Sequence, residues 1–122
     1  MSVIRGRRAD VPVYVTKDGS SIRELMHPEV QGNAKQSLAE ASVPAGGRTL
    51  LHRHRDSEEI YHFLSGTGWM TLDAETFAVA PGDSVLIPPG AAHCLRNDGA
   101  EPLRLLCACS PAYRHADTEL LE

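Results

Sequence analysis

The stretch that decides the fold covers residues 46–66 and reads GGRTLLHRHRDSEEIYHFLSG. His52 and His54 are one residue apart, and side chains at positions i and i+2 of an extended strand point to the same face. Both imidazoles should therefore aim at one point. Glu59 follows in residues 58–64, which again have the composition of a strand. Two imidazoles and a carboxylate that converge from neighbouring strands are typical of a site for a first-row transition metal.

A second stretch, residues 82–97, reads GDSVLIPPGAAHCLRN and offers a further ligand. Its apolar segment 84–87 runs into a Pro-Pro pair, where a strand must end or turn because proline cannot donate a hydrogen bond to a sheet ladder. Gly90 then permits the backbone angles of a tight turn. His93 begins the next strand, and a turn in this place can bring its imidazole back beside the first pair.

Together the two stretches resemble the two sequence motifs of the cupin family. The first motif is a glycine, five residues, HxH, three or four residues, a glutamate, six residues and a glycine. The second is a glycine, five residues, PxG, two residues, a histidine, three residues and an asparagine. The positions that match are Gly46, His52, His54, Glu59, Gly66, Gly82, Pro88, Gly90, His93 and Asn97. The resemblance implies one all-β domain over residues 1–122, an antiparallel jelly-roll or double-stranded β-helix barrel, with residues 1–12 as a loose N-terminal segment and residues 110–122 as a C-terminal tail.

The positions of glycine and proline along the chain also indicate how the strands are arranged. Short segments of strand-like composition recur between Gly- and Pro-containing turns, which favours an antiparallel sandwich or jelly-roll barrel. The expected strands are residues 13–16, 36–43, 48–54, 58–64, 69–72, 76–80, 84–87, 93–97 and 103–109. Residues 21–27 are ambiguous, because Ser21 and Glu24 could form the capping box of a short helix, but the resemblance favours a strand. We expect His27 to be a surface histidine rather than an additional ligand.

Alternation along the strands assigns inward and outward faces. The side chains expected to accompany the ligands inward are Arg48, Leu50, Tyr61, Phe63, Leu95 and Asn97. His62 and Cys94 should point away and are excluded as ligands. An outward apolar set of Leu51, Ile60 and Leu64 requires a cover, from an N-terminal strand or a second subunit. Because cupins are commonly dimers through such a sheet, the resemblance implies a homodimer.

The predicted centre holds one divalent transition metal per chain, either Fe, Mn, Ni, Cu or Zn, through His52, His54, Glu59 and His93. The set contains no sulfur ligand, which disfavours a structural zinc site. Four protein ligands on a six-coordinate ion leave two open positions. With one carboxylate the formal charge is about +1, which favours an anionic or enolisable oxygen ligand.

Further residues are candidates for the chemistry of the site. Tyr61 could donate a proton or be a core aromatic, and Arg48 and Gln36 could bind a carboxylate or hydroxyl of a substrate. Cys107 and Cys109 share one face of the last strand. They could act in redox switching or metal binding, but we favour small core side chains, since free cysteine is often buried.

Composition narrows the function class. A chain of 122 residues is one domain, and a net charge of −4 argues against nucleic acid as a partner. The sequence has no signal peptide or membrane-spanning segment and an odd number of cysteines, so we expect a cytoplasmic protein without a membrane partner. We favour a metal-dependent enzyme of dioxygenase or sugar isomerase type, acting on a small anionic or polyhydroxylated molecule. The alternative is a non-catalytic module that binds a metal or a small ligand.

Overall fold

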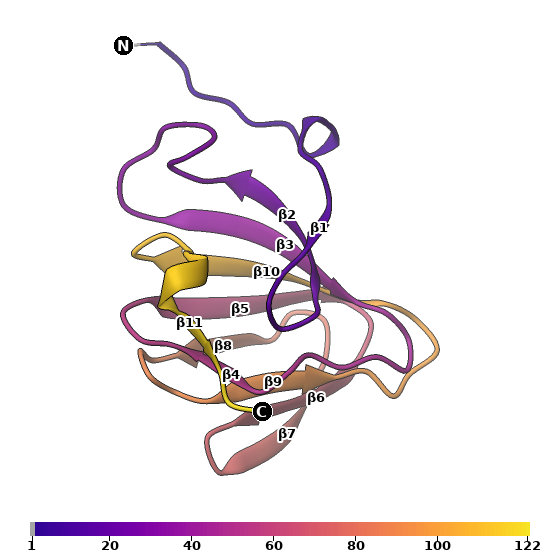
Figure 1. Ribbon diagram of the computed structural model, residues 1–122. Coiled ribbons are helices and arrows are strands. Elements are labelled where there is room, and N and C mark those ends of the chain that lie inside the picture. The colour runs from indigo at the N-terminus through magenta and orange to yellow at the C-terminus, as the bar shows by residue number, and fades with distance from the viewer. Residues whose placement is uncertain (1) are drawn as a thin grey trace.

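The computed structural model of the protein describes residues 2–122, which form two antiparallel sheets packed face to face (Figure 1). The strands are β1 (Tyr14–Val15), β2 (Ser21–Met26), β3 (Ser37–Val43), β4 (His52–His54), β5 (Glu58–Ser65), β6 (Gly68–Leu72), β7 (Glu75–Val79), β8 (Ser84–Ile87), β9 (His93–Arg96), β10 (Leu103–Ser110) and β11 (Thr118–Leu120), and the short 3-10 turns are η1 (Arg8–Asp10) and η2 (His115–Asp117). The six-stranded sheet has the order β1-β2-β3-β10-β5-β8 and the five-stranded sheet the order β11-β4-β9-β6-β7. The expected all-β jelly-roll architecture is confirmed.

The core lies between the inner faces of the two sheets. Phe63, Met70, Leu103 and Leu105 are fully buried there. Residues 21–27, ambiguous in sequence, lie mostly in β2, which pairs with β3 from Ser21 onwards. A helix of this length is marginal in water, whereas pairing with a neighbouring strand satisfies the backbone. The preference for a strand is therefore confirmed.

The predicted faces are correct on two of the three ligand strands. On β5 the side chains of Glu59, Tyr61 and Phe63 are buried, whereas Ile60 and Leu64 are exposed. On β9 and just after it His93, Leu95 and Asn97 are buried, as expected. These strands are paired on both sides, and the register of β5 with β10 shifts only beyond Phe63, so the alternation of the pleat determines burial.

The expected strand over residues 48–54 is regular only at His52–His54, and the predicted inward face of Arg48 is wrong. Arg48 forms an isolated bridge with Arg96, and the backbone of Leu50 donates instead to the carbonyl oxygen of Asp18. Because the ladder is interrupted here, the alternation breaks. Thr49 is buried and the side chain of Arg48 is 57% exposed.

The outward apolar set does not form one surface. Leu51 precedes β4 of the five-stranded sheet and is bonded to the C-terminal tail, where Leu121 N–H donates to its carbonyl oxygen. Ile60 belongs to the other sheet, in a row across β3, β10, β5 and β8 made of Leu38, Ala108, Ile60 and Leu86. We call these four residues the outer apolar row.

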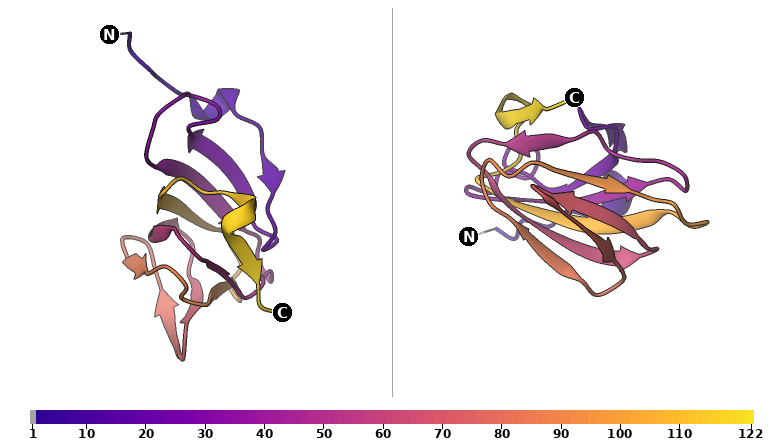
Figure 2. Two further views of the ribbon diagram at one scale, coloured as in Figure 1. Left: turned by 60° about the vertical axis from the view of Figure 1, so that its left-hand side comes forward. Right: turned by 90° about the horizontal axis from the view of Figure 1, so that it is seen from below.

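The C-terminal end of the chain packs against both sheets. In Figures 1 and 2 the yellow C-terminal segment runs from β10 in one sheet to β11 in the other, where β11 pairs with β4. Near the other end, Arg8 forms an ion pair with Glu40 on β3; Met1 lies outside the described residues. Neither 3-10 turn in residues 2–122 has the length and hydropathy of a membrane-crossing helix.

Candidate metal centre

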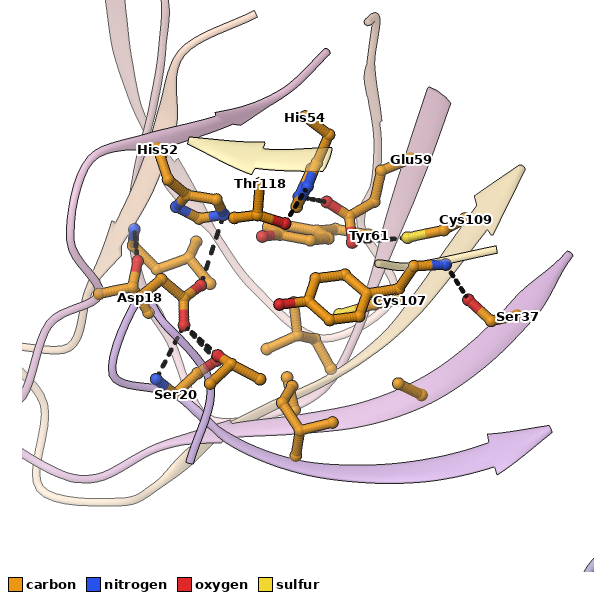
Figure 3. A pocket seen from close by; sticks show the side chains of 18 of the residues that line it. Asp18, Ser20, Ser37, His52, His54, Glu59, Tyr61, Cys107, Cys109 and Thr118 are labelled. Carbon is orange, nitrogen blue, oxygen red and sulfur yellow. Dashed lines mark hydrogen bonds and ion pairs between the residues drawn. The ribbon is translucent and has the colours of Figure 1, made fainter. Parts of the chain in front are cut away.

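Three imidazoles meet inside the barrel. His52 and His54 lie on β4 and point toward the interior (Figure 3), and His93 on β9 pairs directly with His52 across the ladder. One ring nitrogen from each lies within 4.8 Å of the others, and the three residues are 0–5% exposed. This buried cluster could hold one metal ion.

The hydrogen bonds of the three rings fix their tautomers. His52 Nδ1 lies 2.8 Å from the carbonyl oxygen of Leu50, and His93 Nδ1 lies 2.9 Å from that of Ala91. A carbonyl can only accept, so both Nδ1 atoms carry the proton and both Nε2 atoms carry a lone pair. Fixing the tautomer through the second nitrogen is the usual way in which proteins orient metal-binding histidines.

The tautomer of His54 is set by a residue of the C-terminal tail. Its Nδ1 is 3.0 Å from Thr118 Oγ1, and that hydroxyl donates its own hydrogen to the carbonyl oxygen of Arg114. The Thr118 oxygen must then accept from His54 Nδ1–H, which leaves the His54 Nε2 lone pair free. Burial lowers the pKa of His54, but the contact of its Nε2 with Glu59 outweighs this and raises it, so a cation at this Nε2 competes with a proton.

Glu59 lies against two of these nitrogens. Its Oε1 is 3.2 Å from His54 Nε2 and 3.5 Å from His93 Nε2. Its Oε2 accepts a hydrogen bond of 3.2 Å from the thiol of Cys109. Burial raises the pKa of Glu59, but positive charge on the side of the His54 and His93 imidazoles outweighs this and lowers it to about 2. Burial also lowers the pKa of His52 to about 4, so at neutral pH Glu59 is ionised and His52 is neutral.

These contacts fit a bound cation. Within residues 2–122, Glu59 Oε1 and His93 Nε2 are buried polar atoms without a hydrogen-bond partner, and lone pairs that face each other at such distances repel unless a cation lies between them. Ligand atoms at about 2.1 Å from one ion are about 3.0–3.4 Å apart at cis or tetrahedral positions. The observed carboxylate–imidazole distances of 3.2 and 3.5 Å are close to that range.

The centre opens on a cavity of about 40 Å³. Tyr61 lines it, and burial raises the pKa of this phenol well above its ordinary value, so the hydroxyl keeps its proton. Tyr113 and Thr118 of the C-terminal tail also line it. The C-terminal tail therefore forms part of the cavity wall.

Several predicted site residues lie elsewhere. Arg48 pairs with Glu122 at 2.8 Å, outside the cavity, and Gln36 is exposed just before β3. Neither belongs to the cavity lining. His27 is buried rather than on the surface, and its Nε2 bonds to the carbonyl oxygen of Tyr113. It therefore anchors the tail.

Cys107 and Cys109 are free and buried, as the core interpretation predicted. Both also line the cavity. Burial raises the pKa of both thiols, and the Cys109 thiol donates a hydrogen bond to Glu59 Oε2.

Sequence reasoning missed one acidic residue of the site. Asp18, in the turn between β1 and β2, places Oδ2 3.4 Å from His52 Nε2 (Figure 3). In sequence the segment Thr-Lys-Asp-Gly-Ser indicates a turn, and nothing in its spacing connects it to the HxH motif. Only the hydrogen bond between Leu50 N–H and the Asp18 carbonyl oxygen shows how the turn is brought to β4.

Replacing Thr118 with valine should weaken metal binding without removing a ligand. Valine has a similar shape but cannot accept from His54 Nδ1, so the ring loses the bond that fixes its tautomer. Loss of such a supporting contact lowers metal affinity by about 10- to 100-fold, which calorimetric titration with Zn²⁺ would measure. Thr118→Ser keeps the hydroxyl and should bind as the wild type does. Equal affinities of all three proteins would contradict the role of Thr118.

Known proteins are similar to this chain in sequence and in fold. Residues 39–109 match the family model for the Cupin domain. An uncharacterized protein of Methanocaldococcus jannaschii is 52% identical over 122 residues, covering 100% of this chain and 98% of that protein. The polyketide cyclase RemF of Streptomyces resistomycificus has a similar fold, with a TM-score of 0.83 at 22% identity over 99% of this chain and 87% of its own. The oxalate decarboxylase of Lactobacillus farciminis, solved as a formate complex, gives a TM-score of 0.80 at 26% identity, covering 93% of this chain and 34% of its own.

The first two findings decide the family. The family model spans more than half of the chain, and its matched region contains all three clustered histidines. The relative from M. jannaschii extends this similarity over the whole length. The chain belongs to the cupin family.

Proposed function

We propose that this cupin is a metal-dependent enzyme that holds one divalent transition metal through His52, His54, Glu59 and His93 and acts on a small oxygen-bearing substrate. The observation that carries this proposal is the convergence of three fixed Nε2 lone pairs and the unpartnered Glu59 Oε1 beside a cavity. When bound, the metal supplies a Lewis acid or an oxygen-activating centre.

The chain's own residues prepare the site for this chemistry. Burial of the ligand side chains excludes bulk water, which strengthens electrostatic interactions inside the cavity. Glu59 stays ionised, and Cys109 holds one of its oxygens. The protonated phenol of Tyr61 lies in the cavity wall and could donate a proton to a substrate oxygen.

The cavity suits a small molecule. Its volume is about 40 Å³ and its lining is largely apolar with a few polar groups, as in sites for small ligands. The formate held by the oxalate decarboxylase relative is one such ligand.

The second candidate is a non-catalytic metal- or small-ligand-binding module. Its support is the largely apolar lining of the cavity, which includes Ile22, Ala39, Val43 and Leu105, since few polar groups are present there to orient a reacting substrate. An enzyme requires the open side of the metal to be reached by a substrate.

Metal analysis and a substrate screen separate these candidates. Protein purified without added metal should contain about one transition metal ion per chain, as one such site predicts. The loaded protein should turn over a member of a panel of keto acids, sugars and catechols, and a chelated sample should not. Consumption of dioxygen during turnover would identify an oxygenase, and conversion without it an isomerase. A loaded protein that binds these ligands but converts none would favour the module.

A second copy of this chain is our proposal for the partner of the outer apolar row. Ile60 and Leu86 are 44% and 53% exposed, and the row continues across four paired strands. An apolar surface of this kind is typical of an interface. Light scattering should give about twice the 13.2 kDa of one chain. A mass of one chain at high concentration would contradict the dimer.

A further inference from the structure

We propose that Asp18 supplies a second carboxylate oxygen to the metal, so that the ion is held by three imidazoles and two carboxylates. This inference rests on the proposed function, because it assigns an additional ligand to the same centre. It concerns a residue outside both sequence motifs, in the turn between β1 and β2.

The two oxygens of Asp18 have different surroundings. Oδ1 accepts hydrogen bonds from Thr16 Oγ1 at 2.6 Å, from Ser20 N–H at 2.9 Å and from Ser20 Oγ at 2.7 Å. Oδ2 lies instead 3.4 Å from His52 Nε2. Because Oδ1 is engaged by the turn, the carboxylate is oriented with its second oxygen toward the centre (Figure 3).

A cation bound at the centre would account for the contact with His52. His52 Nδ1 donates to the carbonyl oxygen of Leu50, so Nε2 offers a lone pair and no hydrogen. A carboxylate oxygen facing that lone pair is repelled unless positive charge lies between them. Asp18 is only 9% exposed, so water can screen this repulsion little.

Asp18 and Glu59 are held in the same way. In each carboxylate one oxygen accepts from a protein donor, Ser20 and Thr16 for Asp18 and Cys109 for Glu59. The other oxygen faces imidazole Nε2 atoms at 3.2–3.5 Å. Glu59 borders His54 and His93, and Asp18 borders His52, so the two acids lie against different members of the cluster.

The turn that carries Asp18 is tied to the segments that carry the histidines. The Asp18 carbonyl oxygen accepts from Leu50 N–H at 2.7 Å, two residues before His52. The neighbouring Lys17 Nζ donates to the carbonyl oxygens of His115 and Thr118 in the tail. Asp18 is therefore fixed relative to both β4 and the residue that orients His54.

The second carboxylate changes the substrate class expected at the centre. A divalent ion with two carboxylates has a formal charge of about zero, in place of the +1 expected for Glu59 alone. Five protein ligands on a six-coordinate ion leave one open position. The centre would then take a neutral ligand through a single oxygen, such as a hydroxyl, a carbonyl or dioxygen, in preference to a chelating anion.

The test is Co²⁺ binding, followed by calorimetry and by the visible absorption bands, which report the ligands and geometry of the ion. In Asp18→Asn the amide oxygen can still accept the hydrogen bonds of the turn, but an NH₂ group replaces Oδ2. We expect its Co²⁺ affinity to fall at least about 10-fold and its bands to shift. Asp56→Asn removes the same charge at a side chain that is 67% exposed and should change neither.

Two further comparisons make the result decisive. Ser20→Ala loosens the turn by removing one donor to Oδ1 but keeps Oδ2, so its bands should match those of the wild type. Bands of Asp18→Asn that match the wild type would overturn the inference, whatever its affinity. Wild-type protein that binds no Co²⁺ would instead sink the proposed function itself.

Discussion

Replacing His52 with alanine is expected to remove the bound metal, from about one ion per chain to none detectable. The His52 imidazole is 2% exposed and contributes one of three fixed Nε2 lone pairs. Without it, the remaining ligands surround a gap beside Asp18 that only weakly held water can fill. The ratio of metal to protein after dialysis, measured by mass spectrometry of the elements, gives the answer directly.

The same substitution should abolish stabilisation by metal. A ligand that binds only the folded state at a thousand times its dissociation constant adds about 4 kcal/mol to the free energy of unfolding, so the wild-type melting temperature should rise when Zn²⁺ is added. His52→Ala should show no such rise. His62→Ala is the matched control, because His62 lies on the ligand strand β5 but bonds to Ser84 on the outer face. Stoichiometric metal in His52→Ala would disprove the ligand assignment.

Replacing Phe63 with alanine is expected to cause the largest loss of stability. Phe63 is fully buried, with its ring centroid 6.1 Å from that of Tyr61 in an edge-to-face arrangement. Truncation of a buried Phe costs about 3–5 kcal/mol, through lost burial and the cavity left behind. The free energy of unfolding of a whole domain is only about 5–15 kcal/mol, so the variant should be close to unfolding at room temperature.

Urea denaturation in the presence of a chelator measures this effect without a contribution from metal. Leu64→Ala serves as the control, because Leu64 is the next residue of β5 and is 39% exposed. It should lose less than about 1 kcal/mol. Equal losses at the two positions would contradict the inward and outward faces assigned to β5.

The Glu59 and His93 strands show why a large part of the fold could be predicted. In a regular strand the side-chain period is two, so one ligand fixes the orientation of its neighbours. Tyr61 and Phe63 therefore follow Glu59 inward, and Leu95 follows His93. The proline pair and Gly90 ended β8 at the expected residue, because proline restricts the chain wherever it occurs.

Arg48 shows where the same reasoning fails. It assumed a continuous strand up to His54, but the chain there bonds to the Asp18 turn and to β9 instead. Once the hydrogen-bond ladder of a strand is interrupted, the alternation of side chains before the break no longer predicts which faces they take after it. The face of Thr49 and Arg48 was thus set by partners that are distant in sequence.

The sequence by itself determined the all-β jelly-roll class, the three histidines that cluster, His52, His54 and His93, and the family of the chain, because these depend on spacings within short segments. Only the tertiary structure decided which groups support them: Asp18 beside His52, Thr118 beside His54 and Cys109 beside Glu59. The last two contacts join residues 64 and 50 positions apart. Such contacts leave no periodic trace in the chain, since they arise from the way the turn, the tail and the two sheets close around the same cavity.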